Sequence, residues 1–264
     1  MKSTKPCLPL TRLCWGPDCR FESDQRPDQS CYPLVIKETE DNIMNTNESK
    51  TTKTELVFIL DKSGSMSGLE SDTIGGYNAM LKKQQQASGA ARVTTVLFDD
   101  VYEVLHDRID IQGVAPITED EYYVGGCTAL LDAIGKTIHK IANAQRYTQP
   151  EHRSDQVIFV ITTDGLENAS REYSYEKIKE LIEREKNQYQ WEFIFLGANI
   201  DAIETAARFG ISADRAANYH ADGQGTQLNY RVVSEVVSEM RACKPIPANW
   251  KAEIDEDFKR RGKK

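Results

Sequence analysis

The segment Asp61-Lys62-Ser63-Gly64-Ser65 places one carboxylate and two hydroxyl groups at alternate positions of a short stretch. In an extended turn, side chains two residues apart point the same way, so the oxygens of Asp61, Ser63 and Ser65 can converge on one point. A charged oxygen ligand beside neutral ones suits a hard divalent cation of the magnesium type, which prefers oxygen ligands in an octahedral arrangement. This stretch is therefore the first candidate for a cation site.

The surrounding sequence predicts that a strand and a helix position this stretch. The apolar run 56–60 (Leu-Val-Phe-Ile-Leu) precedes it and is typical of a buried strand, and an amphipathic stretch begins near Leu69. Open α/β sheets bind ligands outside the carboxyl ends of their strands, and Asp61 falls at such an end.

Two further oxygen donors occupy similar places in the sequence. Asp164 follows the predicted strand 156–162, and Thr128 comes after Gly125-Gly126 and directly before a predicted helix. The resulting set of two carboxylates and three hydroxyls leaves room for water or an outside acidic group to complete an octahedron. Any one of these residues could instead be an ordinary helix cap or turn residue. Their order and their shared placement at strand ends and helix starts favour the cation site.

Strands alternate with helices from residue 55 onward, which predicts an α/β fold. We expect a Rossmann-like open sheet of about six strands, mostly parallel, with helices on both faces. One edge strand must be antiparallel, because the turn Asp99-Asp100 leaves no room for a crossover helix. Gly75-Gly76, inside the first helix, predicts close packing or a ligand at that point. The predicted strands are 55–61, 92–98, 101–110, 156–162, 191–197 and 216–220, and the predicted helices are 69–87, 129–146, 174–187, 201–209 and 226–242.

The chain divides into three predicted parts: a leader of residues 1–53, a domain of residues 54–244 and a charged, solvated C-terminal tail of residues 245–264. The leader is rich in polar residues and proline, which predicts disorder. Two alternatives remain: a zinc site, although the paired C-x2-C spacing is missing, and an over-extended reading frame whose true start is Met44. The cysteines of the zinc alternative are Cys7, Cys14, Cys19 and Cys31.

Composition excludes several classes of protein. The 264-residue chain has a formal net charge of −8 and a sequence pI near 5.2, which disfavours nucleic-acid binding because that depends on Lys and Arg. No stretch approaches the roughly 20 apolar residues of a membrane span, and we find no apolar core of a secretory signal near the N-terminus. We expect a cytoplasmic protein with no membrane and no nucleic-acid partner.

Over about residues 54–244 the sequence resembles the von Willebrand factor type A domain, in its bacterial intracellular form. The family's metal-ion-dependent adhesion site consists of Asp-x-Ser-x-Ser, a distant Thr and a distant Asp. Every position of that motif is filled in this chain, by Asp61, Ser63, Ser65, Thr128 and Asp164.

The resemblance implies one bound ion, Mg²⁺ or else Mn²⁺ or Ca²⁺, ligated directly by the serines and the threonine and through water by the aspartates. It also implies a non-catalytic adaptor, a monomer, whose protein partner presents an Asp or Glu to the ion; that partner is expected to be an ATPase or another assembly. Around the site, Asp132 either holds the loop or is an exposed helix residue, and Glu167 and Asp99 are candidates for peripheral roles.

Two other functions stay open at this point. A metal-dependent hydrolase of phosphoesters would use the same ion, although no general base is placed by a motif. A structural domain would use the ion only for stability. Two apparent catalytic motifs fail: Gly135-Lys136-Thr137 lies inside a predicted helix and lacks the first glycine of a phosphate loop, and Ser65, Asp164 and His220 lack the G-x-S-x-G elbow of a hydrolase triad.

Overall fold

A six-stranded sheet in the order β3-β2-β1-β4-β5-β6 forms the centre of the computed structural model, which describes residues 52–262. All neighbouring strands are parallel except β2 and β3, which are antiparallel. The predicted α/β class and the antiparallel edge strand are thereby confirmed. The strands are β1 (Lys53–Asp61), β2 (Ala90–Phe98), β3 (Tyr102–Asp110), β4 (Gln156–Thr163), β5 (Glu192–Ala198) and β6 (Ala216–Tyr219).

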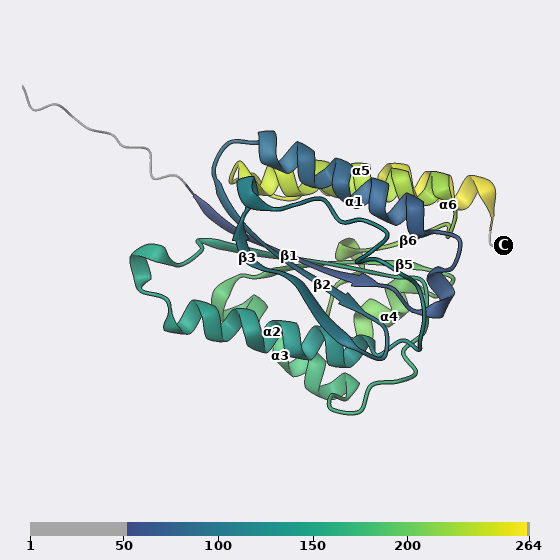
Figure 1. Ribbon diagram of the computed structural model, residues 1–264, viewed down its shortest axis with the longest axis horizontal. Coiled ribbons are helices and arrows are strands. Elements are labelled where there is room, and N and C mark those ends of the chain that lie inside the picture. Colours follow the sequence, from purple (N-terminus) through teal and green to yellow (C-terminus); the bar gives the residue numbers. More distant parts are fainter. Residues whose placement is uncertain (1–51, 263–264) are drawn as a thin grey trace, which may run out of the picture. The chain divides into compact units, whose positions relative to one another are not determined.

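Helices cover both faces of the sheet (Figure 1). One face carries α1, α5 and α6, and the other carries α2, α3 and α4. The helices are α1 (Glu70–Gln86), α2 (Leu130–Tyr147), α3 (Tyr175–Tyr189), α4 (Ala202–Arg208), α5 (Gly223–Arg241) and α6 (Ala252–Arg261). A short 3-10 turn, η1 (Gly64–Met66), lies between β1 and α1.

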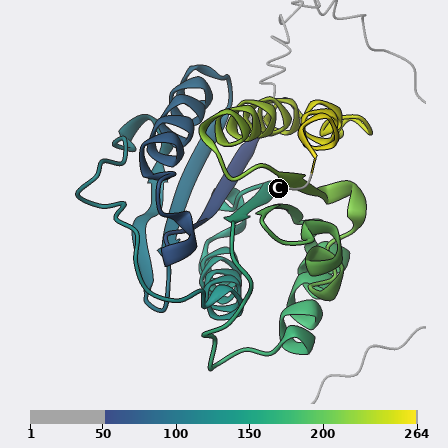
Figure 2. The ribbon, with the colours of Figure 1, turned by 90° about the vertical axis from the view of Figure 1, so that its right-hand side faces the viewer.

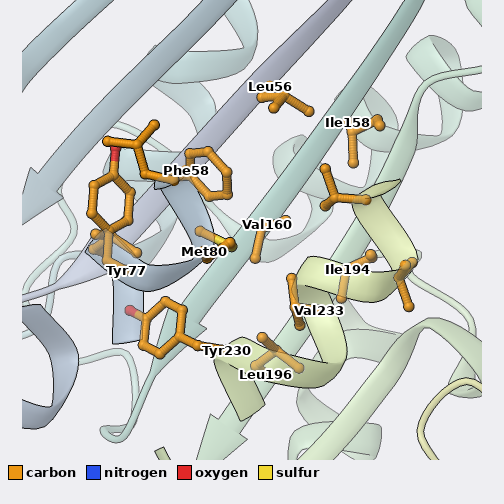
Figure 3. Close-up of a cluster of buried hydrophobic side chains, with 14 of the residues drawn as sticks. Leu56, Phe58, Tyr77, Met80, Ile158, Val160, Ile194, Leu196, Tyr230 and Val233 are labelled. Carbon is orange, nitrogen blue, oxygen red and sulfur yellow. The ribbon is translucent and has the colours of Figure 1, made fainter. Parts of the chain in front are cut away.

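The core consists of two apolar layers, one on each side of the sheet, because neighbouring residues of a strand point to opposite faces. Leu56, Phe58 and Leu60 of β1 pack toward α1 and α5, while Val57 and Ile59 pack toward α2 and α3. Figure 3 shows the first layer, in which Phe58 and Tyr77 meet edge to face at 5.5 Å between ring centroids. Burial on both faces explains why β1 reads as a continuous apolar run.

The C-terminal segment differs from its prediction. We expected residues 245–264 to be a solvated tail, but residues 252–261 form α6, which packs on the sheet beside β6. Trp250 and Ile254 are buried, and the Trp250 indole donates a 2.7 Å hydrogen bond to the Asp214 carbonyl. The prediction of a solvated tail was wrong. A narrow apolar stripe is enough for a highly charged helix to pack against the hydrophobic core.

The predicted leader, residues 1–53, lies outside the described residues except for Thr52 and Lys53. Lys53 is the first residue of β1, so the first strand begins earlier than predicted. No helix within residues 52–262 is long and apolar enough to cross a membrane.

Candidate cation site

The predicted site residues lie on three loops at one edge of the sheet, beyond the carboxyl ends of β1 and β4. This edge is at the right of Figure 1 and faces the viewer in Figure 2. Asp61 ends β1, and Asp164 follows β4, the strand paired with β1. Thr128 lies two residues before α2. The structure brings all three loops together although the residues are far apart in the chain.

Asp61 is buried and held in one orientation. One carboxylate oxygen accepts a 2.7 Å hydrogen bond from the Ser63 amide, and the other accepts a 2.5 Å hydrogen bond from the Thr163 hydroxyl. Burial raises the pKa of the Asp61 carboxyl, while these hydrogen bonds lower it and leave a net rise. The carboxylate is therefore a buried negative charge only partly compensated by the protein.

The three predicted hydroxyl donors form a chain with Ser63 in the middle. Ser63 Oγ and Ser65 Oγ are 3.1 Å apart, and the Thr128 hydroxyl donates to Ser63 Oγ at 3.0 Å. Gly165 presses against the same group, because a Cβ placed on it would lie 2.9 Å from Ser65 Oγ and 3.0 Å from Thr128 Oγ1. The loop after β4 thus reaches the hydroxyls of the other two loops.

Asp164 is the least satisfied polar side chain of the site. It is 2% exposed, and neither carboxylate oxygen has a donor in good hydrogen-bond geometry within residues 52–262. Its pKa is raised to about 6: burial and, to a smaller extent, the charge of Asp61 raise it, while the nearby Ser65 hydroxyl lowers it. A buried carboxylate without donors is destabilised, and a bound cation would relieve this.

The segment 122–126 is fastened along the Asp61 turn, and this arrangement was not foreseen from the sequence. The Tyr122 hydroxyl donates to the Asp61 carbonyl at 2.5 Å, and the Gly125 amide donates to the Lys62 carbonyl at 2.9 Å. In return, the Gly64 amide donates to the Gly126 carbonyl at 3.1 Å. These hydrogen bonds fix the loop that leads to Thr128.

Lys62, between the two first donors of the motif, is also buried. Its ammonium pairs with Glu103 at 3.0 Å and lies 4.1 Å from the centroid of the Tyr123 ring. Although burial disfavours its charge, the hydrogen bond and attraction of Glu103 raise its pKa. The close approach of this loop to the β2–β3 turn requires glycine at position 126, whose φ is 69° and whose Cβ would overlap the side chains of Asp99 and Asp100.

The acidic residues considered for secondary roles prove to hold the loops. Asp132 is buried, not exposed, and accepts backbone hydrogen bonds from Arg171, Glu172 and Tyr173 at 2.9–3.0 Å, so it holds the loop that leads from Asp164 to α3. Glu167 accepts hydrogen bonds from the amides of Leu131, Ala169 and Ser170. Asp99 caps its own turn through the Val101 amide at 2.6 Å.

The donor set fits a hard cation. It contains one buried carboxylate whose two oxygens lack hydrogen-bond donors, one hydrogen-bonded carboxylate and three hydroxyls linked through Ser63. No group of three or more His, Cys, Asp and Glu side chains in the described part of the chain has a metal-binding arrangement. Soft-metal sites rich in sulfur or imidazole are therefore not found there.

No protein-family model matches the sequence, and no curated protein sequence matches it. Solved structures do match. The pilus adhesin SpaC from Lactobacillus rhamnosus GG, in its open conformation, aligns with a TM-score of 0.55 and 11% identity over 72% of this chain and 30% of the adhesin. The von Willebrand factor domain of the type V pili tip protein Mfa5 from Porphyromonas gingivalis aligns with a TM-score of 0.52 and 10% identity, over 71% of this chain and 95% of that domain.

A von Willebrand factor type A protein from Catenulispora acidiphila gives a TM-score of 0.51 and 14% identity, over 71% of this chain and 43% of that protein. The chain also spans only 46% of the mussel byssus matrix protein PTMP1, another structure that it matches. At such low sequence identity these likenesses show the fold alone.

Proposed function

We propose that this protein, which has the fold of von Willebrand factor type A domains, is a non-catalytic module that binds a partner protein through a divalent cation. The ion, Mg²⁺ or else Mn²⁺ or Ca²⁺, would be held by the five residues of the candidate site. An Asp or Glu side chain of the partner would occupy an open coordination position. The ligands are Asp61, Ser63, Ser65, Thr128 and Asp164.

The observation that carries this proposal is the buried Asp164 carboxylate, which lacks a hydrogen-bond donor in good geometry and directly precedes Gly165, the residue packed against the Ser65 and Thr128 hydroxyls. Two carboxylates balance the charge of one divalent ion, and the Lys62 ammonium is balanced by Glu103, so the loaded site would be neutral. A neutral site with an open position at the ion accepts one further carboxylate without strong repulsion. When bound, the cation supplies the positive charge that attracts the partner's acidic group.

A binding role is favoured over catalysis by the partners of the polar groups. The Ser65 hydroxyl lies 3.1 Å from the Ser63 hydroxyl, and the only hydrogen bond found for the His220 ring in the described region goes to the Phe258 carbonyl at 3.3 Å, so Ser65 and His220 do not form a nucleophile–base pair there. The Gly135-Lys136-Thr137 triplet lies inside α2, so it does not form a phosphate-binding loop. Two proteins of matching fold are described as a pilus adhesin and a pili tip protein, which also supports binding.

We further propose that the encounter takes place in the cytoplasm and that the partner belongs to a larger assembly, such as one driven by an ATPase. This part of the proposal is based on the resemblance to intracellular bacterial domains. The residues of this chain support the other part of the proposal, the binding of an acidic group at the cation.

The test combines direct ion binding with partner capture. Calorimetry with Mn²⁺ and Mg²⁺ should show one ion bound to the native protein and none to Asp61→Ala, with circular dichroism verifying that the variant is folded. Asp120→Ala, at an exposed loop position, is the matched control and should bind the ion normally. Capture of a protein from native lysate should require Mg²⁺ and an intact Asp61. Capture that persists both in Asp61→Ala and in chelator would refute the proposal.

A further inference from the structure

Three large apolar side chains stand exposed on the loops before α2 and after β4, which form the candidate cation site, and on the neighbouring β2–β3 turn. Val101 is 60% exposed, Tyr123 is 59% exposed and Leu166 is 63% exposed. Val101 belongs to the β2–β3 turn, Tyr123 belongs to the loop before α2, and Leu166 belongs to the loop after β4. We call these three residues the apolar rim.

Leu166 and Tyr123 each follow a residue that contacts a donor residue of the site, and Val101 follows a residue that contacts the loop leading to Thr128. Leu166 follows Gly165, where a Cβ would lie within 3.0 Å of the Ser65 and Thr128 hydroxyls. Tyr123 follows Tyr122, which bonds to the Asp61 carbonyl. Val101 follows Asp100, whose side chain approaches Gly126 and the Cys127 amide. The three exposed residues therefore belong to segments that adjoin the candidate site.

The backbone under these exposed side chains is held firmly. The Tyr123 ring rests on the buried Lys62 ammonium, 4.1 Å from the ring centroid. The Val101 amide donates to Asp99 Oδ1 at 2.6 Å, and the residue after Leu166, Glu167, accepts hydrogen bonds from the amides of Ala169 and Ser170. Side chains presented on a rigid backbone lose little conformational entropy when a partner covers them.

Single exposed apolar residues are common on protein surfaces, so exposure alone carries no meaning. The apolar rim is informative because of where its residues lie. Tyr147 and Tyr189, which are 80% and 60% exposed, end α2 and α3 and so lie at the opposite edge of the sheet, where Ile109 also lies. Ile203, 36% exposed, begins α4 further along the site edge.

We infer that the apolar rim selects the partner: a protein segment in which the cation-binding Asp or Glu stands between aliphatic or aromatic residues. This inference rests on the proposed function, because the cation is what attracts the acidic group. Apolar neighbours that settle on Val101, Tyr123 and Leu166 would exclude water from the ion and its new ligand. In such a dry contact the charge attraction is less screened than in water.

The test uses two synthetic pentapeptides with blocked ends. The first has the sequence glycine, leucine, glutamate, leucine, glycine, and the second has serine in place of both leucines. Nuclear magnetic resonance titrations with saturating Mg²⁺ give their affinities for the full-length protein. We expect the leucine peptide to bind about tenfold more tightly, the gain expected from partial burial of two leucine side chains. Replacing its glutamate by glutamine should abolish binding.

Two double variants separate the apolar rim from general effects. Val101→Ser combined with Leu166→Ser should reduce the leucine peptide to the affinity of the serine peptide while ion binding stays unchanged. Tyr147→Ser combined with Tyr189→Ser removes a similar exposed apolar area at the other edge and should leave the tenfold preference intact.

Failure of this inference is distinguishable from failure of the proposed function. Equal, Mg²⁺-dependent affinities for the two peptides would overturn the role of the apolar rim and leave cation-mediated capture standing. If calorimetry shows a bound ion but neither peptide binds, or if no ion binds at all, both proposals are wrong.

Discussion

The Tyr122 hydroxyl donates a 2.5 Å hydrogen bond to the main-chain carbonyl of Asp61, the residue at the end of β1. Tyr122 is 1% exposed, so this hydrogen bond is shielded from water. Together with the Gly125 amide, which donates to Lys62, it anchors the loop before α2 on the Asp61 turn. Thr128 is thereby held beside the serine hydroxyls by the protein itself.

Removing this hydrogen bond should weaken both the fold and the site. Tyr122→Phe should lower the free energy of unfolding by about 1–2 kcal/mol, because a buried carbonyl loses its donor. It should also weaken Mg²⁺ binding severalfold, since the Thr128 loop becomes less well placed. Urea unfolding and calorimetry measure the two effects. Tyr230→Phe is the control: the Tyr230 hydroxyl is buried without a partner in the described region, so its loss should be neutral or stabilising. Equal effects of the two substitutions would contradict this assignment.

Metal-free protein should lose stability as the pH rises from about 4 to about 6, as far as Asp164 contributes. The pKa of Asp164 is about 6 in the folded protein, against an ordinary value of 3.8. Below pH 4 both folded and unfolded states carry the proton, whereas between these values only the folded state retains it. The contribution of Asp164 to the free energy of unfolding is therefore lowest above pH 6, where its carboxyl is ionised in both states.

Asp164→Asn tests this sign. In chelator at pH 7 the variant should melt at a higher temperature than the native protein, and near pH 4 the two should converge. Added Mg²⁺ should stabilise only the native protein at pH 7, since the ion binds the folded state. A native protein that melts at the same temperature as Asp164→Asn throughout this pH range would show that the carboxylate is not destabilised.

The two adjacent glycines of α1 should respond in opposite directions to alanine. A Cβ on Gly76 would overlap the Tyr230 ring of α5, so Gly76→Ala should destabilise the protein by about 1–3 kcal/mol. A Cβ on Gly75 meets nothing within 4 Å, so Gly75→Ala should stabilise the helix by up to about 1 kcal/mol. Thermal unfolding of both variants measures the difference. If both variants were destabilised to a similar extent, overlap with the Tyr230 ring would not explain the effect of Gly76→Ala.

Helix α6 should contribute to global stability. Ile254, 1% exposed, packs with the layer that contains α1 and α5, and Ile254→Ala should cost about 2–4 kcal/mol. Lys259→Ala, on the exposed side of the same helix, should change stability by less than about 0.5 kcal/mol. Denaturant unfolding compares the two. An unaffected Ile254→Ala would indicate that α6 is not part of the cooperative fold.

Sequence patterns were sufficient for the sheet but not for every helix. The strands stand out because β1, β4 and β5 are buried on both faces and read as apolar runs bounded by polar turns. Helix α6 was missed because its charged residues dominate its composition. The signal was nonetheless present, since Trp250, Ile254 and Phe258 follow one another at the four-residue spacing of a helix face.

The site shows the same division between local and distant information. The spacing of Asp61, Ser63 and Ser65 is local and could be recognised at once. The anchoring by Tyr122 and the placing of Lys62 under Tyr123 depend on contacts between segments about 60 residues apart. A tyrosine pair before two glycines gives no hint of its acceptor. Long-range contacts of this kind are visible only once the strands are assembled.

The position of β1 determines how the candidate site withstands local opening. β1 lies between β2 and β4 in the interior of the sheet, and residues 54–61 are all buried. In native-state hydrogen exchange, edge elements such as β3, β6 and α6 should open at lower free energy than β1, whose amides should exchange only through global unfolding. Fraying at either margin of the sheet would thus leave Asp61 in place. Competence to bind an ion would then be lost together with the fold, in a single cooperative step.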